Sequence, residues 1–180
     1  MNISVIGRGN VGGGLARLWR ARGHDVQEVG KDGGDVSNAE AVLLAVPWSA
    51  IPDALGSATG LEGKVVVDAT NFFGDERPDF PSLAHQVKSI VSGPVAKAFN
   101  LNFARIYDEI ANQTPPPGCL YCAEDGAREV TERLIRDAGY EPVDAGGLDS
   151  ARALEDMLAV LGAVSRANGG PGFYRFWRPS

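Results

Sequence analysis

The segment that most constrains the fold is a glycine-rich turn within the first fourteen residues. Residues 2–6 (NISVI) predict a short apolar strand, and the sequence GRGNVG at 7–12 follows it at once. An amphipathic helix is predicted from Leu15 to Arg22, and a second strand from Asp25 to Val29. A Gly-x-Gly-x-x-Gly pattern between a strand and a helix, inside a β-α-β unit of about thirty residues, indicates a dinucleotide-binding site.

Each glycine of this turn has a physical reason. Gly7 permits the tight turn off the strand, Gly9 lets the backbone approach a diphosphate where a Cβ atom would collide, and Gly12 allows close packing of the helix on the strand. The unpaired N–H groups of the first helical turn then face the phosphate charges. A glycine-rich turn without a ligand is the alternative. Gly13 and Gly14 weaken the helix by about 1 kcal/mol each relative to alanine, which is either tolerated or marks close approach of another element.

Composition and charge narrow the class of protein. With 180 residues, 44% of them hydrophobic, the chain suits one domain plus a small appendage. The formal charge of −6 argues against nucleic acid as a partner. A basic N-terminal segment followed by a long apolar run is missing, as is any apolar stretch long enough to span a membrane. We therefore expect a cytoplasmic protein that binds a small-molecule substrate, with neither nucleic acid nor membrane as partner.

Strands and helices are predicted to alternate along the chain. Further strands are expected at 41–46, 64–68 and 94–99, with helices at 50–55, capped by Ser49, and at 80–90. The link between the second strand and Ala41 is too short for a normal crossover helix. This alternation predicts an α/β fold with a doubly wound, Rossmann-type parallel sheet over residues 1–114, the dinucleotide-binding domain.

A Pro-rich breaker at 114–118 separates this part from a C-terminal appendage at 115–180. The appendage is predicted to pack on the first domain as a β-α-β unit followed by a long helix. Its expected elements are a strand at 119–122, a helix at 126–138, a strand at 141–144 and a helix at 150–168.

Cysteine and histidine residues give little support for metal or acyl-transfer chemistry. Cys119 and Cys122 form a C-x-x-C pair within a predicted strand, where residues three apart point to opposite faces, so we expect buried thiols. His24 and His85 fall in a turn and an outer helix. We therefore expect no metal site and no catalytic side chain, and hydride transfer between two aligned planar rings suits such a site.

Ligands of open α/β sheets bind at the carboxyl ends of the strands. The segments expected at this edge are 7–12, 30–32, 46–48, 68–71 and 97–100. Their convergence on one edge supports a functional reading more strongly than any single segment.

The end of the second strand bears on the choice of cofactor. The usual acidic residue that binds the ribose of NAD is replaced by Gly30, and Lys31 follows it. Lys31, with Arg8, is suited to pair with the 2′-phosphate of NADP. Asp32 leaves NAD open, because a shift of one residue would make it the ribose ligand. We favour NADP.

Polar and aromatic residues at the other strand ends are candidates for the nicotinamide and substrate. Asn71 and Asn100 either bind the nicotinamide carboxamide or a substrate oxygen, or form local turns. Lys97 is either a solvent-facing strand residue or a charge beside the substrate. Trp48, with Pro47, either forms a wall of the nicotinamide site or covers the core.

Five segments of the chain resemble, in order, one family of enzymes: 7–12, 46–49, 63–71, 95–100 and 142–146. They are similar to the NADPH-dependent coenzyme F420 reductases (deazaflavin:NADP oxidoreductases), whose cofactor domain also occurs in the Steap metalloreductases. The resemblance implies direct hydride exchange between nicotinamide and a deazaflavin. It also implies that the diphosphate is held by Gly7, Arg8, Gly9, Asn10 and Val11, that the adenosine end meets Gly30 and Lys31, and that Val46, Pro47, Trp48, Asn71 and Asn100 border the nicotinamide and acceptor.

Two other functions remain open at this stage. The same fold serves a reductase of a different small substrate, such as a metal chelate or an imine, and it also serves a non-catalytic nucleotide-sensing module. An aromatic and cationic cluster at 173–178 either covers a flat ring system or seals a homodimer interface, and we favour the homodimer.

Overall fold

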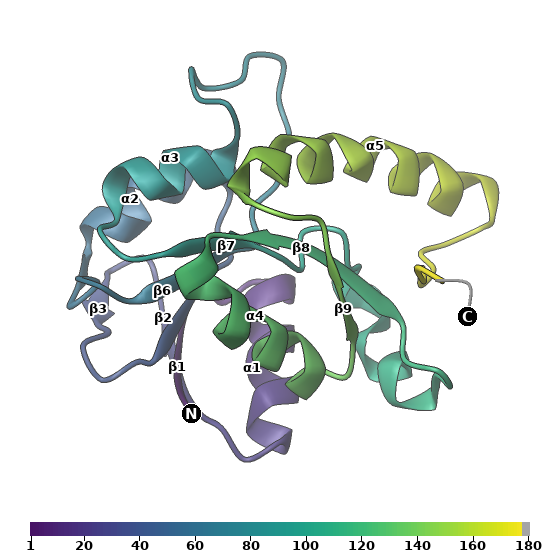
Figure 1. Ribbon diagram of the computed structural model, residues 1–180, viewed down its shortest axis with the longest axis horizontal. Helices are drawn as coiled ribbons and strands as arrows, with labels where there is room; N and C mark the ends of the chain where they lie inside the picture. The colour runs from purple at the N-terminus through teal and green to yellow at the C-terminus, as the bar shows by residue number, and fades with distance from the viewer. Residues whose placement is uncertain (178–180) are drawn as a thin grey trace.

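The computed structural model describes residues 1–177 and contains a seven-stranded, mainly parallel sheet in the order β2-β1-β4-β6-β7-β8-β9 (Figure 1). A separate two-stranded sheet pairs β3 with β5. The strands are β1 (Asn2–Ile6), β2 (Asp25–Val29), β3 (Gly34–Asp35), β4 (Ala41–Leu44), β5 (Ala58–Thr59), β6 (Val65–Asp68), β7 (Val95–Lys97), β8 (Gly118–Ala123) and β9 (Glu141–Asp144).

Helices cover both faces of the sheet, as a doubly wound fold requires (Figure 1). They are α1 (Asn10–Ala21), α2 (Ile51–Gly56), α3 (Leu83–Ile90), α4 (Asp125–Asp137) and α5 (Ala151–Ala167). Three short 3₁₀ segments complete the described elements: η1 (Trp48–Ala50), η2 (Ala104–Asn112) and η3 (Leu148–Ser150). The predicted α/β, Rossmann-type class is therefore confirmed.

Two hydrophobic cores lie on opposite sides of the sheet. Helices α1 and α4 pack on one side, where the Trp19 indole is buried and donates a hydrogen bond to the Leu134 carbonyl at 2.9 Å. Helices α2, α3 and α5 pack on the other side through Ile51, Leu83 and Leu154. Strands β4 and β6 are buried along their whole length, which follows from helices covering both faces.

One strand pair departs from the predicted parallel sheet. β8 runs antiparallel to β7, with Lys97 opposite Cys122, whereas β9 is parallel to β8. The chain leaves β7 at its carboxyl end and re-enters the sheet at the same edge after η2, so β8 must run in the opposite direction. The β8-α4-β9 unit therefore extends the main sheet beyond β7.

One of two predicted helix starts differs from the structure. Ser49 does not cap a helix, because η1 spans it and α2 begins after Ala50 without a side-chain cap. Helix α3 begins at Leu83, directly after the predicted start near Pro81 and Ser82, because the Ser82 hydroxyl accepts a hydrogen bond from the His85 amide and caps the helix.

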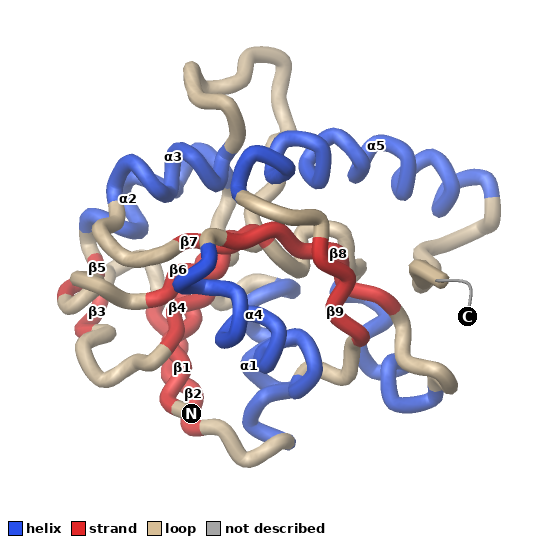
Figure 2. Tube along the Cα trace, in the orientation of Figure 1, coloured by secondary structure: helices blue, strands red, loops and turns tan. Residues whose placement is uncertain are grey.

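The connection from β2 to β4 is short, as predicted. Its only regular element is β3, which pairs with β5 beside the main sheet (Figure 2). Gly33 has a φ of +77° in this connection, and a Cβ atom there would lie 2.2 Å from the Ser57 carbonyl oxygen. The close approach of the two segments thus requires glycine at this position.

Helix α5 is only partly covered. Leu154 is buried near its start, whereas Val160 and Val164 are 59% and 52% exposed farther along. The second half of the helix projects to the right of the sheet in Figure 1. Among residues 1–177, no helix is both long and apolar enough to cross a membrane.

Some residues of the C-terminal cluster at 173–178 pack against the protein, and others are exposed. The Tyr174 hydroxyl accepts a hydrogen bond from the Leu120 amide at 3.0 Å, and Phe173 packs against the α1/α4 core. Phe176 and Trp177 are exposed, and Arg178 lies outside the described residues. Part of this cluster therefore anchors the chain end to β8.

Candidate nucleotide and acceptor site

The turn after β1 has the backbone geometry that its glycines predict. Gly7 has a φ of +111°, and a Cβ atom there would lie 2.2 Å from the Ala45 carbonyl oxygen. A Cβ atom on Gly12 would lie 2.0 Å from the Gly7 carbonyl oxygen. Both glycines are therefore required by the packing of the turn itself.

Gly9 differs, because a Cβ atom there would meet nothing within 4 Å. Gly9 is the N-cap of α1, and the helix has neither a side-chain cap nor an acidic residue in its first turn. The first N–H groups of α1 therefore have no protein acceptor from a capping side chain, and such a helix start favours an anion. The space beside Gly9 is where a diphosphate would approach.

Gly14 marks a close approach of a different kind. A Cβ atom there would lie 2.6 Å from Cδ2 of Tyr107, a buried residue of η2. The glycine thus lets η2 pack on α1. Close approach of another element was one of the two interpretations of the weakened helix, and it applies at Gly14.

A cavity of about 610 Å³ lies between the glycine turn and the end of β2. Arg8, Gly30, Lys31 and Asp32 line one side of it, and Val46 and Pro47 line the other. The Arg8 guanidinium lies across Gly30, since a Cβ atom on Gly30 would be 3.1 Å from Arg8 Cζ. Glycine at this position leaves room for the arginine, and the cavity is lined by two cations, Arg8 and Lys31, and by two carboxylates, Asp32 and Asp53.

A larger cavity of about 860 Å³ adjoins the first, and both are lined by Ala45, Val46 and Pro47. Val11 at the start of α1 also lines the larger cavity, as do Asn71 and Asn100. The wall on α5 comprises Asp156 and a set of residues at helical spacing: Glu155, Leu158, Ala159, Gly162 and Arg166. The two cavities together follow the carboxyl ends of the central parallel strands.

Asn71 and Asn100 are brought together in the larger cavity, as their positions at strand ends predict. Phe99, directly before Asn100, adopts a left-handed φ of 63°. The Asn100 side-chain amide donates to Asn71 Oδ1 at 3.1 Å and to the Leu154 carbonyl at 3.2 Å. The local-turn interpretation therefore does not describe these side chains, which join β6, β7 and α5.

Two buried polar atoms at this place have no hydrogen-bond partner among the described residues. They are Oγ1 of Thr70 and Oδ1 of Asn100, and both residues line the larger cavity. Buried polar atoms without hydrogen-bond partners are uncommon in native proteins and are destabilising. Their presence at a cavity wall is what a site for a polar ligand group requires.

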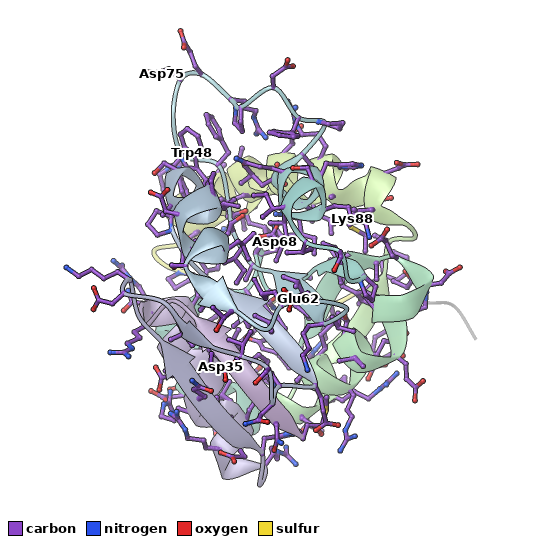
Figure 3. All side chains as sticks on the ribbon, turned by 90° about the vertical axis from the view of Figure 1, so that its left-hand side faces the viewer. Asp35, Trp48, Glu62, Asp68, Asp75 and Lys88 are labelled. Atoms are coloured by element: carbon purple, nitrogen blue, oxygen red, sulfur yellow. The ribbon has the colours of Figure 1, made fainter. Side chains whose placement is uncertain are left out.

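Lys97 is completely buried, so the solvent-facing interpretation is wrong. Its Nζ atom donates to Asp68 Oδ2 at 2.7 Å, the Thr70 carbonyl at 2.9 Å and Glu155 Oε1 at 3.0 Å. Strand β8 covers the edge of β7, α3 packs on its face, and Glu155 of α5 lies against the ammonium group, which excludes water from this position. Asp68 lies in the interior of the molecule in Figure 3.

Glu155 is a site residue that sequence reasoning missed. Its side chain is fully buried, and it bonds to the Leu83 amide at 2.8 Å and to Arg77 at 3.1 Å. Arg77 also binds Asp156 at 2.8 Å. The available signal was a carboxylate on the apolar stripe of α5, directly after Leu154, since buried carboxylates need partners.

Trp48 is not among the residues that line either cavity. Its indole N–H donates to the Phe73 carbonyl at 3.0 Å, and its ring lies 4.9 Å from the Phe72 ring. Phe72 and Phe73 do line the larger cavity. In Figure 3, Trp48 lies below the loop that carries Asp75, so the indole supports this loop. Asn10 is exposed and is likewise outside both cavity linings.

The cysteines are buried on opposite faces of β8, as predicted. Cys119 belongs to the α1/α4 core and Cys122 to the α2/α3/α5 core, and both thiols are free. Burial raises the pKa of Cys119 to about 12 and that of Cys122 to about 11. Within residues 1–177, no group of three or more His, Cys, Asp and Glu side chains is placed to hold a metal ion.

Both histidines lie outside the two cavities. His24 Nε2 is 2.9 Å from Asp137 Oδ2, on the α1/α4 side of the sheet. His85 Nδ1 is 2.7 Å from the Ser82 hydroxyl at the start of α3. Neither histidine is positioned to transfer a proton at the strand-end site.

Comparison of the sequence with protein families matches residues 31–72 to a family described as NADP oxidoreductase, coenzyme F420-dependent. This match confirms, over that segment, the resemblance expected from the sequence motifs. No curated protein sequence matches the chain.

Solved structures similar to the chain share its fold. A protein of Arthrobacter sp. FB24, provisionally named an F420-dependent NADP-reductase, has a TM-score of 0.83 and 22% identity, with 98% of this chain and 99% of that chain covered. A hypothetical protein, SMa0349, from Sinorhizobium meliloti has a TM-score of 0.70 and 24% identity, with 84% and 88% covered.

An imine reductase from Aspergillus terreus, solved with NADPH4 and dibenz[c,e]azepine, has a TM-score of 0.68 and 15% identity. The match covers 93% of this chain but 63% of the reductase, so the chain spans less than two thirds of that protein. The chain thus shares the Rossmann-like fold of these proteins.

Proposed function

We propose that the protein transfers a hydride between NADP(H) and a planar acceptor, the deazaflavin coenzyme F420. The observation that carries this proposal is the pair of adjoining cavities along the carboxyl edge of the sheet, joined at Ala45, Val46 and Pro47. An extended dinucleotide that crosses this junction would have its adenosine end in one cavity and its nicotinamide in the other. The larger cavity then has room for a second ring system.

The glycine turn is suited to the diphosphate. Gly9 offers open backbone where a Cβ atom would otherwise lie, and the first amides of α1, at Asn10 and Val11, have no capping side chain. Arg8 and Lys31 supply positive charge beside the adenosine end, which favours the 2′-phosphate of NADP. Asp32 lines the same cavity and is the residue through which NAD would bind instead.

The unpaired buried atoms are suited to the nicotinamide carboxamide. This group has two N–H donors and one carbonyl acceptor. Oδ1 of Asn100 accepts hydrogen bonds, whereas the Thr70 hydroxyl both donates and accepts. Binding would therefore satisfy two polar atoms that the protein leaves without partners.

The acceptor would lie between the nicotinamide and α5. Phe103, Leu158 and Ala159 make this part of the cavity apolar, and its volume is in the range of sites for drug-sized ligands. NADP, when bound, supplies the hydride chemistry, and this chain's residues orient the two rings and exclude water. Proximity and alignment supply most of the rate enhancement in such a reaction, so no catalytic side chain is required.

The test is a hydride-transfer assay with purified protein. NADPH absorbance should fall when the deazaflavin is added, and should remain constant with an imine or a ferric chelate. Reduction of one of the last two acceptors would instead assign a different substrate. If NADPH binds and none of these acceptors is reduced, the proposed function is wrong.

A thermal-shift comparison separates the cofactors. A nucleotide present at about one hundred times its Kd stabilises a protein by roughly 2.7 kcal/mol. We expect a larger shift with NADP than with NAD at equal concentration, and a further shift when the deazaflavin is added with NADP.

We also propose a homodimer that uses the exposed part of α5. Val160 and Val164 present exposed apolar side chains there. Trp177, which follows α5 in the sequence, is 76% exposed. Light scattering after size-exclusion chromatography should give twice the chain mass of 19.0 kDa. Val164→Lys should then reduce that mass to the monomer value.

A further inference from the structure

One buried carboxylate lies where three separate parts of the chain meet. Glu155 Oε1 accepts hydrogen bonds from the Lys97 ammonium at 3.0 Å and from the Leu83 amide at 2.8 Å. Its other oxygen, Oε2, accepts from Arg77 at 3.1 Å. Strand β7, the start of α3 and the loop at 72–82 are therefore all bonded to one side chain of α5.

The lysine side of this network reaches the proposed nicotinamide end of the cavity. All three N–H groups of Lys97 are used, by Asp68, by Glu155 and by the carbonyl of Thr70. Thr70 directly precedes Asn71, whose amide donates to the Asn100 carbonyl at 2.7 Å. The same ammonium thus fixes both the backbone before Asn71 and the carboxylate that binds the loop.

The arginine side reaches the acceptor end. The loop at 72–82 contains neither a helix nor a strand, yet Phe72, Phe73 and Arg77 line the larger cavity. The Arg77 guanidinium lies 4.8 Å from the centre of the Phe72 ring and is bound by Glu155 and Asp156. The position of this cavity wall therefore depends on the pairing of Arg77.

We propose that Glu155 is a positioning residue that holds the 72–82 loop in place as a wall of the acceptor cavity. The loop is thereby kept at a fixed position relative to the Asn71–Asn100 pair. This proposal rests on the proposed function for the identity of the acceptor, but the network itself does not depend on it. A buried ionic cluster is weak evidence for stability, since well-packed apolar side chains often serve as well. A role in fixing one loop position is therefore the better explanation of this arrangement.

Glu155→Gln is the sharpest variant because it keeps the shape of the side chain. All three partners of Glu155 are donors, so its two oxygens are both used as acceptors. Glutamine has one oxygen, and its NH₂ group would face either Arg77 or the pair formed by Lys97 and Leu83. At least one contact must therefore break, and the orientation that keeps Lys97 and Leu83 bonded breaks only the contact with Arg77.

The test combines kinetics with limited proteolysis of the full-length protein. We expect Glu155→Gln to raise the KM for the deazaflavin about tenfold and to leave the Kd for NADPH within twofold. A glutamate-specific protease should cleave after Glu76, in the loop that carries Asp75 in Figure 3, about tenfold faster than in the wild type. Glu129→Gln, an exposed change on α4, is the matched control and should match the wild type in each measurement.

Unchanged cleavage and an unchanged deazaflavin KM in Glu155→Gln would overturn the proposal. An equal loss of NADPH and deazaflavin affinity would also overturn it, because the cluster would then act on the whole fold. If Glu155→Gln does not fold, Arg77→Gln decides, since it releases the loop and leaves Lys97 paired. Should the wild type reduce no deazaflavin, the proposed function fails, while the cleavage rates still test the positioning role.

Discussion

Asn71 and Asn100 hold each other through reciprocal hydrogen bonds across the carboxyl ends of β6 and β7. The Asn71 amide donates to the Asn100 carbonyl at 2.7 Å, and the Asn100 amide donates back to Asn71 Oδ1 at 3.1 Å. The two asparagines thus form one rigid unit in which Oδ1 of Asn100 is left without a partner. Such a preorganised acceptor binds a donor without further ordering of the side chain.

Asn100→Ala should weaken NADPH binding about fivefold, because a hydrogen bond that a ligand amide makes in a buried site is worth roughly 1 kcal/mol. The ligand-free protein should also lose about 1–3 kcal/mol of unfolding free energy, since Asn71 Oδ1 and the Leu154 carbonyl lose their donor. Calorimetric titration and urea unfolding measure the two effects. Asn112→Ala is the control, an exposed asparagine that contacts Glu109 and should change neither quantity.

Gly9 and Gly7 should respond in opposite ways to alanine. A Cβ atom at Gly9 meets nothing, so Gly9→Ala should lower the unfolding free energy by less than about 1 kcal/mol and reduce NADPH affinity more than tenfold. Gly7→Ala should instead lose more than about 2 kcal/mol, because it combines a φ of +111° with a Cβ atom 2.2 Å from the Ala45 oxygen. Equal NADPH affinity of Gly9→Ala and the wild type would contradict a diphosphate at this turn.

Lys31→Glu should reduce the preference for NADP over NAD about tenfold, since a repulsive carboxylate would replace an attractive ammonium beside the 2′-phosphate. The ratio of the two Kd values measures this effect. Asp32→Asn is informative as a companion variant: a selective loss of NAD affinity would identify Asp32 as the ribose ligand. If neither variant changes the ratio, Arg8 alone discriminates between the nucleotides or no discrimination exists.

Local patterns were sufficient for much of the fold. The bounds of β1, β2 and β9 agree with the sequence-based prediction, because each is a short segment followed closely by glycine, and β2 and β9 also follow a glycine turn. The opposite-facing Cys119 and Cys122 follow from the period of a strand alone. The convergence of Asn71 and Asn100 follows from the rule that parallel strands end at one edge.

Contacts between residues distant in sequence were not accessible in this way. Lys97 and Glu155 are paired only because β8 lies beside β7 and α5 packs on β8 and α3, and neither contact can be read from the residues around Lys97. The role of Trp48 is a similar case. Its position after β4 predicted a place near the site, but the partner of its indole N–H, Phe73, belongs to an irregular loop.

The two buried thiols predict that the protein loses stability in alkali. Burial raises the pKa of Cys119 to about 12 and that of Cys122 to about 11, from 9.0 in the unfolded chain. Above about pH 9 the unfolded state therefore binds fewer protons than the folded state, so the unfolding free energy falls as pH rises, by about 1 kcal/mol per thiol at pH 10. Urea unfolding at pH 8 and pH 10 measures the loss. The Cys119→Ala/Cys122→Ala double variant should lose less between these pH values, because only groups such as Tyr121, whose pKa is raised to about 12, still contribute. A double variant with the wild-type pH dependence would show that ionisation of the thiols does not drive alkaline unfolding.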